Sequence, residues 1–121
     1  MILVDTSVWI AHFRKGGSRL AKLLGEALVL AHPLVVGELA CGNLRNRARI
    51  LTDLETLPSA ISATHEEVMG LIEDRGLWGL GMGWTDAHLL ASALLSNCQL
   101  WTMDRRLVRA AAAAGVRLYR T

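Results

Sequence analysis

The stretch Met1–Ser7 (MILVDTS) decides the fold of this 121-residue chain, because four apolar residues run directly into an acid and two hydroxyls. A short run that is apolar throughout is typical of a strand buried on both faces, as in the middle of a parallel sheet. Asp5, Thr6 and Ser7 are favoured at helix N-termini, so a helix should follow to about Phe13. The sequence therefore opens with a strand–helix unit that carries a carboxylate at its junction.

The same alternation continues along the chain. The segment Thr64–Glu67 has the form of a capping box, Pro33 suits the first turn of a helix, and Gly115 suits a helix end. We expect helices over residues 18–25, 33–42, 45–55, 64–75, 85–97 and 104–115, and further strands over residues 27–31, 57–62, 98–103 and 116–119. Four glycines predict a mobile or tightly turned loop over residues 76–83. The pattern favours an α/β fold with a mostly parallel sheet of about five strands and helices on both faces.

Composition indicates a single domain over residues 1–121. The chain is 52% hydrophobic and 20% charged, which excludes a disordered chain and allows a well-filled core. We expect no transmembrane helix, because no apolar run approaches about 20 residues, and no signal peptide, because Asp5 interrupts the first apolar run. Cys41 and Cys98 lie far apart in apolar surroundings. They predict buried thiols in a reducing compartment, of which a bacterial-type cytoplasm is the simplest.

The basic residues are mostly arginine. The net charge is only +2, but the chain has 11 Arg and 2 Lys. Arg presents a planar fork to phosphate and stacks on bases, so this bias suits nucleic acid. A GC-rich genome explains it equally well. The arginines at 45, 47 and 49 form one cluster and those at 105, 106 and 109 another, as a basic rim for a phosphodiester substrate would require.

Four carboxylates, Asp5, Glu38, Asp86 and Asp104, occupy positions where apolar or neutral residues are usual. Asp5 and Asp104 follow predicted strands, and if those strands are neighbours the two acids face each other across the crevice at the sheet's carboxyl end. Asp86 begins the helix that leads into the later strand. Glu38 is placed on a helical stripe with Leu34, Val35 and Leu39 that faces the sheet. Buried carboxylates need partners, so together they favour a divalent metal site.

Each acid also has a purely structural interpretation. Asp5 and Asp104 could be simple helix caps, each worth about 1 kcal/mol, and Asp86 could complement the dipole of its helix. Taken singly, these interpretations are the simpler ones. Glu38 is harder to explain in this way, because a carboxylate in the middle of a helix gains nothing from capping.

Four segments together resemble the PIN-domain ribonucleases, and most closely the VapC-type toxins of toxin–antitoxin pairs. They occur in the family's order and cover essentially the whole chain: Ile2–Ile10 (ILVDTSVWI), Gly37–Ala40 (GELA), Trp84–Ala91 (WTDAHLLA) and Leu100–Asp104 (LWTMD). The resemblance implies a PIN-like three-layer sandwich whose acidic pocket binds Mg²⁺ or Mn²⁺ and cleaves RNA. It also implies a cognate antitoxin, often with a basic side chain placed in the pocket, and a homodimer.

The family's acidic positions map onto Asp5, Glu38, Asp86 and Asp104. Because Mg²⁺ prefers oxygen ligands and keeps several waters, we expect Asp5 and Asp86 as the closest ligands, with Glu38 and Asp104 acting directly, through water or on a second ion. The hydroxyl positions of the family pattern are filled by Thr6 or Ser7 and by Thr102, which we expect to orient carboxylates or water. A metal-activated water as nucleophile predicts 5′-phosphate products.

Other readings fit less well. A receiver domain needs an Asp after the third strand and a Lys after the last, but residues 57–62 contain no Asp and the only lysines are at 15 and 22. A haloacid-dehalogenase-type phosphatase needs Asp-x-Asp after the first strand, where this chain has Asp-Thr-Ser at residues 5–7. The four histidines lack metal-ligand spacing, so zinc is not expected. Trp9 and Trp101 are predicted in the core, whereas Trp78 and Trp84 are candidates for base stacking. A PIN-like binding module without turnover is the alternative left open.

Overall fold

Strand β1 (Ile2–Val4) lies at the centre of a three-stranded parallel sheet, between β2 (Val29–Leu30) and β3 (Gln99–Trp101). The computed structural model describes residues 1–120. The chain leaves β1 for β2 on one side and later returns to β3 on the other. This reversal of direction opens a crevice at the carboxyl ends of β1 and β3, where α/β proteins usually bind ligands. The condition stated from the sequence, that the first strand and the strand before Asp104 are neighbours, is met.

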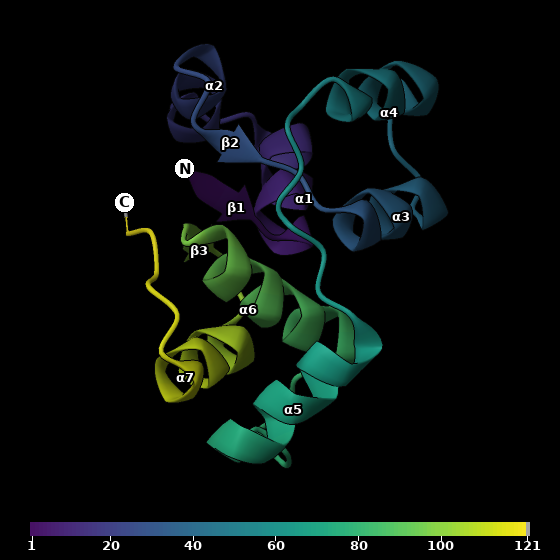
Figure 1. Ribbon diagram of the computed structural model, residues 1–121. Coiled ribbons are helices and arrows are strands. Elements are labelled where there is room, and N and C mark those ends of the chain that lie inside the picture. Colours follow the sequence, from purple (N-terminus) through teal and green to yellow (C-terminus); the bar gives the residue numbers. More distant parts are fainter. Residues whose placement is uncertain (121) are drawn as a thin grey trace.

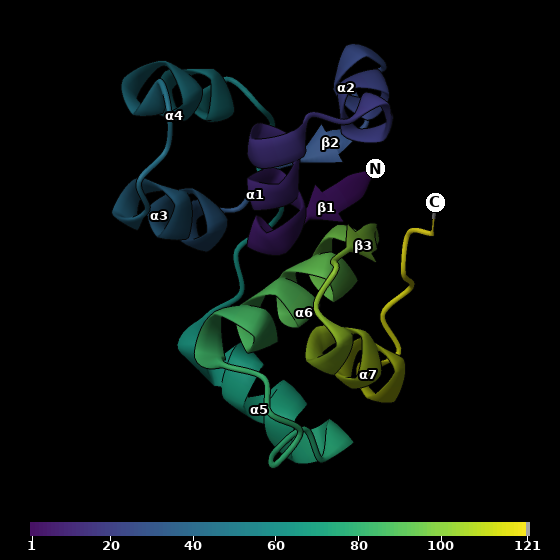
Figure 2. The ribbon, with the colours of Figure 1, turned by 180° about the vertical axis from the view of Figure 1, so that it is seen from behind.

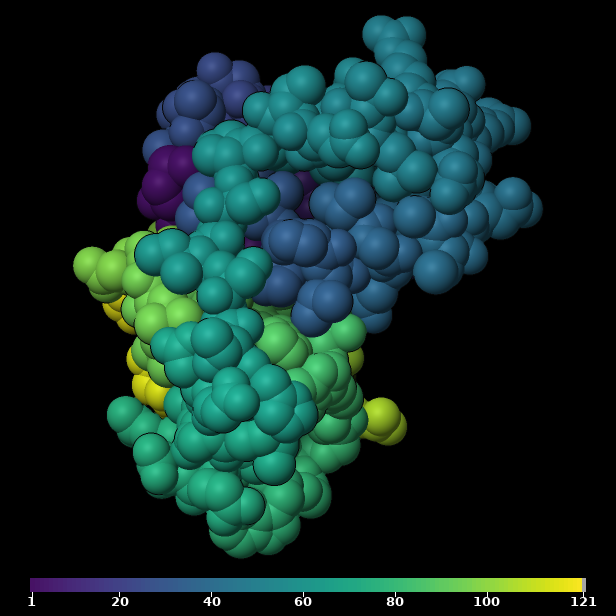
Figure 3. Space-filling view, turned by 45° about the vertical axis from the view of Figure 1, so that its right-hand side comes forward, coloured from purple at the N-terminus to yellow at the C-terminus, as the bar shows by residue number. Residues whose placement is uncertain are grey.

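Helices pack on both sides of this sheet, which confirms the predicted α/β class. In Figures 1 and 2 the first four helices gather in one half of the molecule and the last three in the other, with the strands between them. The helices are α1 (Thr6–Lys15), α2 (Ser18–Gly25), α3 (Pro33–Cys41), α4 (Arg47–Glu55), α5 (His65–Arg75), α6 (Trp84–Ser96) and α7 (Arg105–Ala114). The teal segment from α4 to α5 crosses the surface between the two halves (Figure 3).

The prediction of about five strands is wrong in number. Among the described residues, 57–62 and 116–119 form only isolated parallel bridges, Ala31 with Ser59 and Leu100 with Leu118. Pro58 has no N–H to donate, which limits the first segment. In the second, the hydrogen bonds are confined to Leu100, whose N–H donates to the Arg117 carbonyl at 2.9 Å and whose carbonyl accepts from Tyr119 at 2.8 Å. Both segments therefore lie at sheet edges without extending the ladder.

Several predicted helix ends shift for local reasons. Helix α1 extends past Phe13 through Lys15, and Gly16 ends it with a φ of 70°. Helix α6 begins one residue before Thr85, after Gly83. Helix α5 has the predicted capping box, in which the Thr64 side chain accepts from the Glu67 N–H and the Glu67 side chain accepts from the Thr64 N–H.

The core lies around β1 and between the sheet and the helices. Its largest fully buried side chains include Leu3, Leu89, Leu90, Leu100 and Leu107. Trp9 is buried and stacks on Phe13 with ring centroids 5.7 Å apart, as predicted for a core residue. Trp101 is half-buried and packs against Tyr119.

The two cysteines lie in different surroundings. The prediction that Cys41 is buried is wrong: Cys98 is buried, but Cys41 is exposed at the end of α3, where the helix turns away from the core. Over residues 1–120, no helix is long and apolar enough to cross a membrane.

Candidate active site

Asp5 follows β1 and is held by two hydroxyl groups. Its side chain is 5% exposed, and its Oδ2 accepts hydrogen bonds from Ser7 Oγ and Thr102 Oγ1, both at 2.7 Å. An ionised carboxylate can only accept, so two donors on one oxygen suit it well. Although Asp5 is the residue before α1, its side chain makes no capping hydrogen bond, and the interpretation of Asp5 as a simple cap is wrong.

The two hydroxyls are themselves fixed by the loop after β3. Ser7 Oγ accepts from the Met103 N–H and Thr102 Oγ1 from the Asp104 N–H, each at 3.0 Å. Each hydroxyl therefore accepts a hydrogen bond from a backbone N–H and donates one to the Asp5 carboxylate. This network joins the carboxyl ends of β1 and β3, which are nearly 100 residues apart in the sequence.

Asp86 and Asp104 do cap helices. Asp104 Oδ1 accepts from the Arg106 N–H at 2.9 Å at the start of α7, and Asp86 Oδ2 accepts from the Gly83 N–H at 3.1 Å at the start of α6. These bonds satisfy backbone donors that have no partner within the helix. The structural interpretation is thus correct for both, and each cap also fixes the direction in which its carboxylate points.

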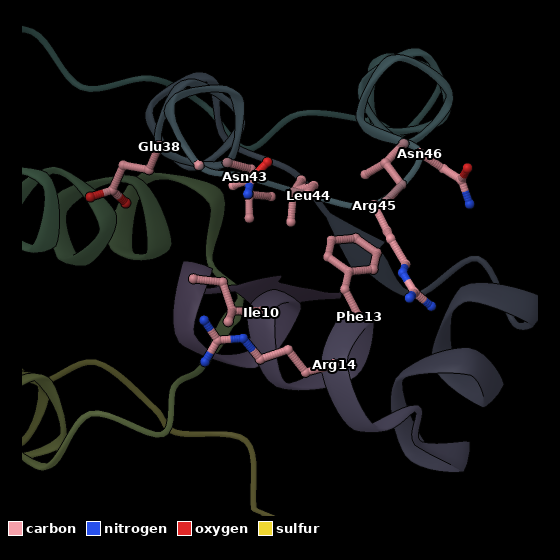
Figure 4. Close-up of a pocket in the computed structure, with 11 residues that line it drawn as sticks. Ile10, Phe13, Arg14, Glu38, Asn43, Leu44, Arg45 and Asn46 are labelled. Carbon is pink, nitrogen blue, oxygen red and sulfur yellow. The ribbon is translucent and has the colours of Figure 1, made fainter.

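Glu38 reaches the site from the exposed side of α3. Its Oε1 accepts from Thr6 Oγ1 at 2.6 Å, which joins the first turn of α1 to α3. The prediction that Glu38 lies on a stripe facing the sheet is wrong. Val35 and Leu39 are 1% exposed, but Leu34 is 37% exposed and Glu38 itself is exposed, because the buried face of α3 is narrow. In Figure 4, Glu38 points from α3 toward α6.

Three of the carboxylates act electrostatically on the fourth, Asp86. The pKa of Asp86 is raised above its ordinary value, first by burial and then, after an opposing hydrogen bond from Gly83, by the negative charges of Asp5, Asp104 and Glu38. Like charges disfavour ionisation only at short range in protein surroundings. The convergence expected from the strand ends is therefore present. Within residues 1–120, however, no three Asp, Glu, His or Cys side chains form a preassembled metal cage.

Each of the four carboxylates has one oxygen occupied and one available. The occupied oxygens are Oδ2 of Asp5, Oε1 of Glu38, Oδ2 of Asp86 and Oδ1 of Asp104. The second oxygen of each accepts no hydrogen bond from the described residues. Carboxylate oxygens are the ligands that Mg²⁺ and Mn²⁺ prefer. The donor set fits a hard divalent cation.

Comparison with known proteins agrees with this geometry. The PIN domain family model matches residues 2–113. The chain belongs to the PIN-domain family. It is 49% identical over 119 residues to "Ribonuclease VapC32" of Mycobacterium tuberculosis, in strains CDC 1551 and H37Rv, and the match covers 98% of this chain and 96% of that protein. This confirms the predicted relation to the VapC-type members of the family.

Solved PIN-like structures share the fold at low sequence identity. FitAB, solved bound to an IR36 DNA fragment, aligns with a TM-score of 0.68 and 17% identity over 98% of this chain and 94% of that one. FitAcB from Neisseria gonorrhoeae aligns with a TM-score of 0.62 and 18% identity over 99% and 97%. PAE2754 from Pyrobaculum aerophilum aligns with a TM-score of 0.62 and 19% identity over 93% and 80%.

Two features beside this PIN site were not predicted from the sequence. Buried His32 caps α3 by accepting from the Leu34 N–H, so its Nε2 carries the proton and donates to Ser92 Oγ on α6 at 3.0 Å. Burial, and then the charge of His88, lower the pKa of His32 and favour this neutral form. The hydrogen bond between His32 and Ser92 joins residues 60 positions apart, and the pattern of polar and apolar residues along the sequence does not predict such a pair.

The second unpredicted feature is an aromatic cluster at the start of α6. The Trp84 ring lies with its centroid 5.2 Å from that of His65 and 4.8 Å from that of His88. Trp84 is exposed and Trp78, in the preceding glycine loop, is 66% exposed. Gly81 in this loop has a φ of 80° and lies against Arg106, where a Cβ would meet Cδ at 3.0 Å. Trp78 and Trp84 therefore remain candidates for stacking on bases.

Proposed function

We propose that the chain is a metal-dependent endoribonuclease, the toxin of a toxin–antitoxin pair, which hydrolyses RNA phosphodiester bonds. The observation that carries the proposal is the convergence of Asp5, Glu38, Asp86 and Asp104, each with one available oxygen. The relation to a protein called Ribonuclease VapC32 supports RNA as the substrate. Both the metal and the residue roles are parts of this proposal.

Asp5 and Asp86 would hold the metal most directly, and Glu38 and Asp104 would bind it or orient its waters. When bound, a divalent ion lowers the pKa of a coordinated water and offsets negative charge on the phosphate. Ser7 and Thr102 would keep Asp5 in one orientation, because their protons are already directed at its Oδ2. Thr6 would steady Glu38 in the same way. These roles follow the general behaviour of outer partners at metal sites.

The repulsion among the four acids gives the metal a further function. Burial first, and then the negative charges of Asp5, Asp104 and Glu38, raise the pKa of Asp86, so without a bound cation the site disfavours full ionisation. A divalent ion offsets this repulsion, as would a basic side chain from a partner. The arrangement is consistent with activation by Mg²⁺ or Mn²⁺ and with neutralisation by an antitoxin.

The remaining parts of the proposal concern the whole protein. We place it in the cytoplasm, as one PIN domain over residues 1–121 that forms a homodimer and binds a cognate antitoxin. Exposed apolar side chains on and before α5 and α6 provide surface for such contacts, namely Ile61, Met69, Leu94 and Leu95. Exposed apolar surface of this kind often marks a protein interface.

The decisive test is cleavage of total cellular RNA by the purified chain. Reactions would contain Mg²⁺, Mn²⁺ or EDTA, with Asp5→Asn beside the unmodified protein. We expect discrete fragments with 5′-phosphates that disappear with EDTA and with the variant. Products ending in 2′,3′-cyclic phosphate would contradict the proposed water nucleophile. No metal-dependent cleavage, in protein shown to be free of antitoxin and to bind Mn²⁺, would favour a binding module.

A further inference from the structure

A pocket of about 520 Å³ lies between α1 and the turn that joins α3 to α4, shown in Figure 4. We call it the α1–α4 pocket. Its lining combines apolar, amide and guanidinium groups from three segments: Ile10, Phe13 and Arg14 of α1, Glu38 and Leu39 of α3, and Gly42, Asn43, Leu44, Arg45, Asn46 and Ile50 around the turn and α4. A volume of this size suits a small ligand or one to two nucleotides better than a second protein domain.

The α1–α4 pocket adjoins the carboxylate site through Glu38. Glu38 is the one of the four acids that lines the pocket, and Figure 4 shows its carboxylate directed away from the pocket, toward α6. The hydrogen bond from Thr6 to Glu38 joins α1 to α3 between the two spaces. The pocket and the carboxylate site therefore share Glu38 as a common border.

Two arginines of the pocket are available to bind an anion. Arg14 and Arg45 are exposed, and within residues 1–120 the single ion pair joins Arg49 to Asp53. In Figure 4 the guanidinium of Arg14 is directed toward the end of the pocket nearer Glu38, and that of Arg45 lies near Phe13. Unpaired guanidinium groups in a row beside an acidic site match the spaced charges of a phosphodiester chain.

Phe13 adds a surface that a base could contact. One face of its ring stacks on buried Trp9, which fixes its orientation, and the ring lines the pocket beside Arg45. Aromatic rings held in this way stack on bases of any sequence. The lining thus contains the two components, cation and ring, that single-stranded nucleic acid requires.

We propose that the α1–α4 pocket binds the RNA nucleotides next to the scissile phosphate, with Arg14 on the nearer phosphate and Arg45 on the next. This inference rests on the proposed nuclease function and adds to it a binding subsite outside the carboxylates. It makes Arg14 and Arg45 substrate-binding residues, separate from the metal chemistry.

The test measures binding and cleavage separately. Binding of a fluorescent single-stranded RNA oligonucleotide is followed by anisotropy in EDTA, at several salt concentrations, for the unmodified chain, for Arg14→Gln with Arg45→Gln, and for Arg19→Gln. Arg19 is exposed on α2 and lies outside the pocket, so its substitution controls for the loss of a positive charge elsewhere on the surface. Cleavage of the same RNA is then measured with Mn²⁺.

We expect the double variant to bind RNA at least about tenfold more weakly, a change of about 1.4 kcal/mol or more, because two charged contacts to phosphate are lost. Loss of two phosphate contacts should also reduce the slope of log affinity against log salt by about 1.4. Cleavage should fall through a higher KM with little change in kcat. Arg19→Gln should bind and cleave as the unmodified chain does.

The outcomes separate this inference from the proposed function. If the unmodified chain cleaves RNA but the double variant matches Arg19→Gln, the pocket is not an RNA subsite and is left for a protein partner. If the double variant loses RNA binding but the unmodified chain does not cleave, the pocket is an RNA-binding site but not a cleavage subsite, and the nuclease proposal fails. If the unmodified chain neither binds nor cleaves RNA, both fail.

Discussion

The two sides of the carboxylate site are held in different ways. On the sheet side, Asp5 is buried and receives two hydroxyl hydrogen bonds, and each hydroxyl is held by a backbone N–H of the loop after β3. On the α3 side, Glu38 is exposed and receives one hydrogen bond, from Thr6. Several connected, mostly part-buried hydrogen bonds hold a side chain more firmly than a single exposed one does.

This difference indicates that the two sides of the site have different roles. The sheet side is ordered before any ligand arrives, as precise placement of reacting groups requires. The α3 side borders the α1–α4 pocket and can adjust to the substrate at little cost. Substitutions on the two sides should therefore differ in size and in kind.

The largest effect is expected from Asp5→Asn, at the centre of the rigid side. The amide oxygen can still accept from Ser7 and Thr102, but an NH₂ group replaces the available oxygen. Activity should fall more than about 100-fold, because outer partners of metal sites alone account for about 10- to 100-fold. The check is kcat/KM on an RNA oligonucleotide, with thermal unfolding as the control for folding. Activity close to that of the unmodified chain would remove Asp5 from the metal site.

The next effect is expected from removal of the two hydroxyls that hold Asp5. Ser7→Ala with Thr102→Val should lower kcat/KM by about 10- to 100-fold. It should also lower the free energy of unfolding by about 1–3 kcal/mol, because Asp5 stays buried without its donors. Urea unfolding gives the second value. Thr52→Val on α4, which removes an exposed hydroxyl bonded to the Ala48 carbonyl, is the matched control.

Thr6→Val tests the adjustable side and should have a smaller effect. Because the Thr6–Glu38 bond is exposed, we expect a loss of activity of a few fold and a change in stability within about 0.5 kcal/mol. The same assays apply. A loss larger than that of the Ser7 and Thr102 double variant would reverse the comparison and make the α3 side the rigid one.

The smallest effect concerns the stability of the metal-free protein. Because the folded-state pKa of Asp86 is raised, its ionised form costs stability above that pKa, and the cost disappears as pH falls through it. Asp86→Asn should therefore raise the Tm in EDTA at neutral pH while its side-chain oxygen still accepts from Gly83. The gain should shrink at acidic pH. An unchanged Tm at neutral pH would mean that neither burial nor the three neighbouring acids penalise the ionised form of Asp86 as described.

The sheet side of the site could be predicted from the sequence, and the reason is geometric. A residue that follows a strand of a parallel sheet must lie at the sheet's carboxyl edge, so Asp5 and Asp104 were assigned to the same place by the positions of their strands alone. The hydroxyl residues, Thr6 or Ser7 and Thr102, were expected from the resemblance to the PIN family, and Ser7 and Thr102 flank these strand ends. The exact pairing of donors and acceptors depends on side-chain rotamers and could not be predicted.

The α3 side was less predictable. A helical repeat places Glu38 beside Leu34 and Leu39 but does not give the width of the buried face, and here that face stops at Val35 and Leu39. The start of α6 shows a similar limit. Thr85 is a better N-cap residue than Gly83 by propensity. However, the Asp86 side chain accepts a hydrogen bond from the Gly83 N–H, and helix α6 begins directly after Gly83. The predicted end of the first helix near Phe13 leaves Arg14 outside it, so the sequence did not predict the place of Arg14 in the α1–α4 pocket.

The double use of Asp86 and Asp104, as helix caps and as site carboxylates, has a genetic consequence. Asn caps a helix about as well as Asp does, and an Asp codon becomes an Asn codon by a single G-to-A transition. One base change at either position should therefore silence the enzyme and leave a folded protein behind. If the chain is toxic when expressed alone, surviving cells should carry such transitions more often than damaging changes in the core. The surviving cells would then contain an inactive protein that can still bind its partner.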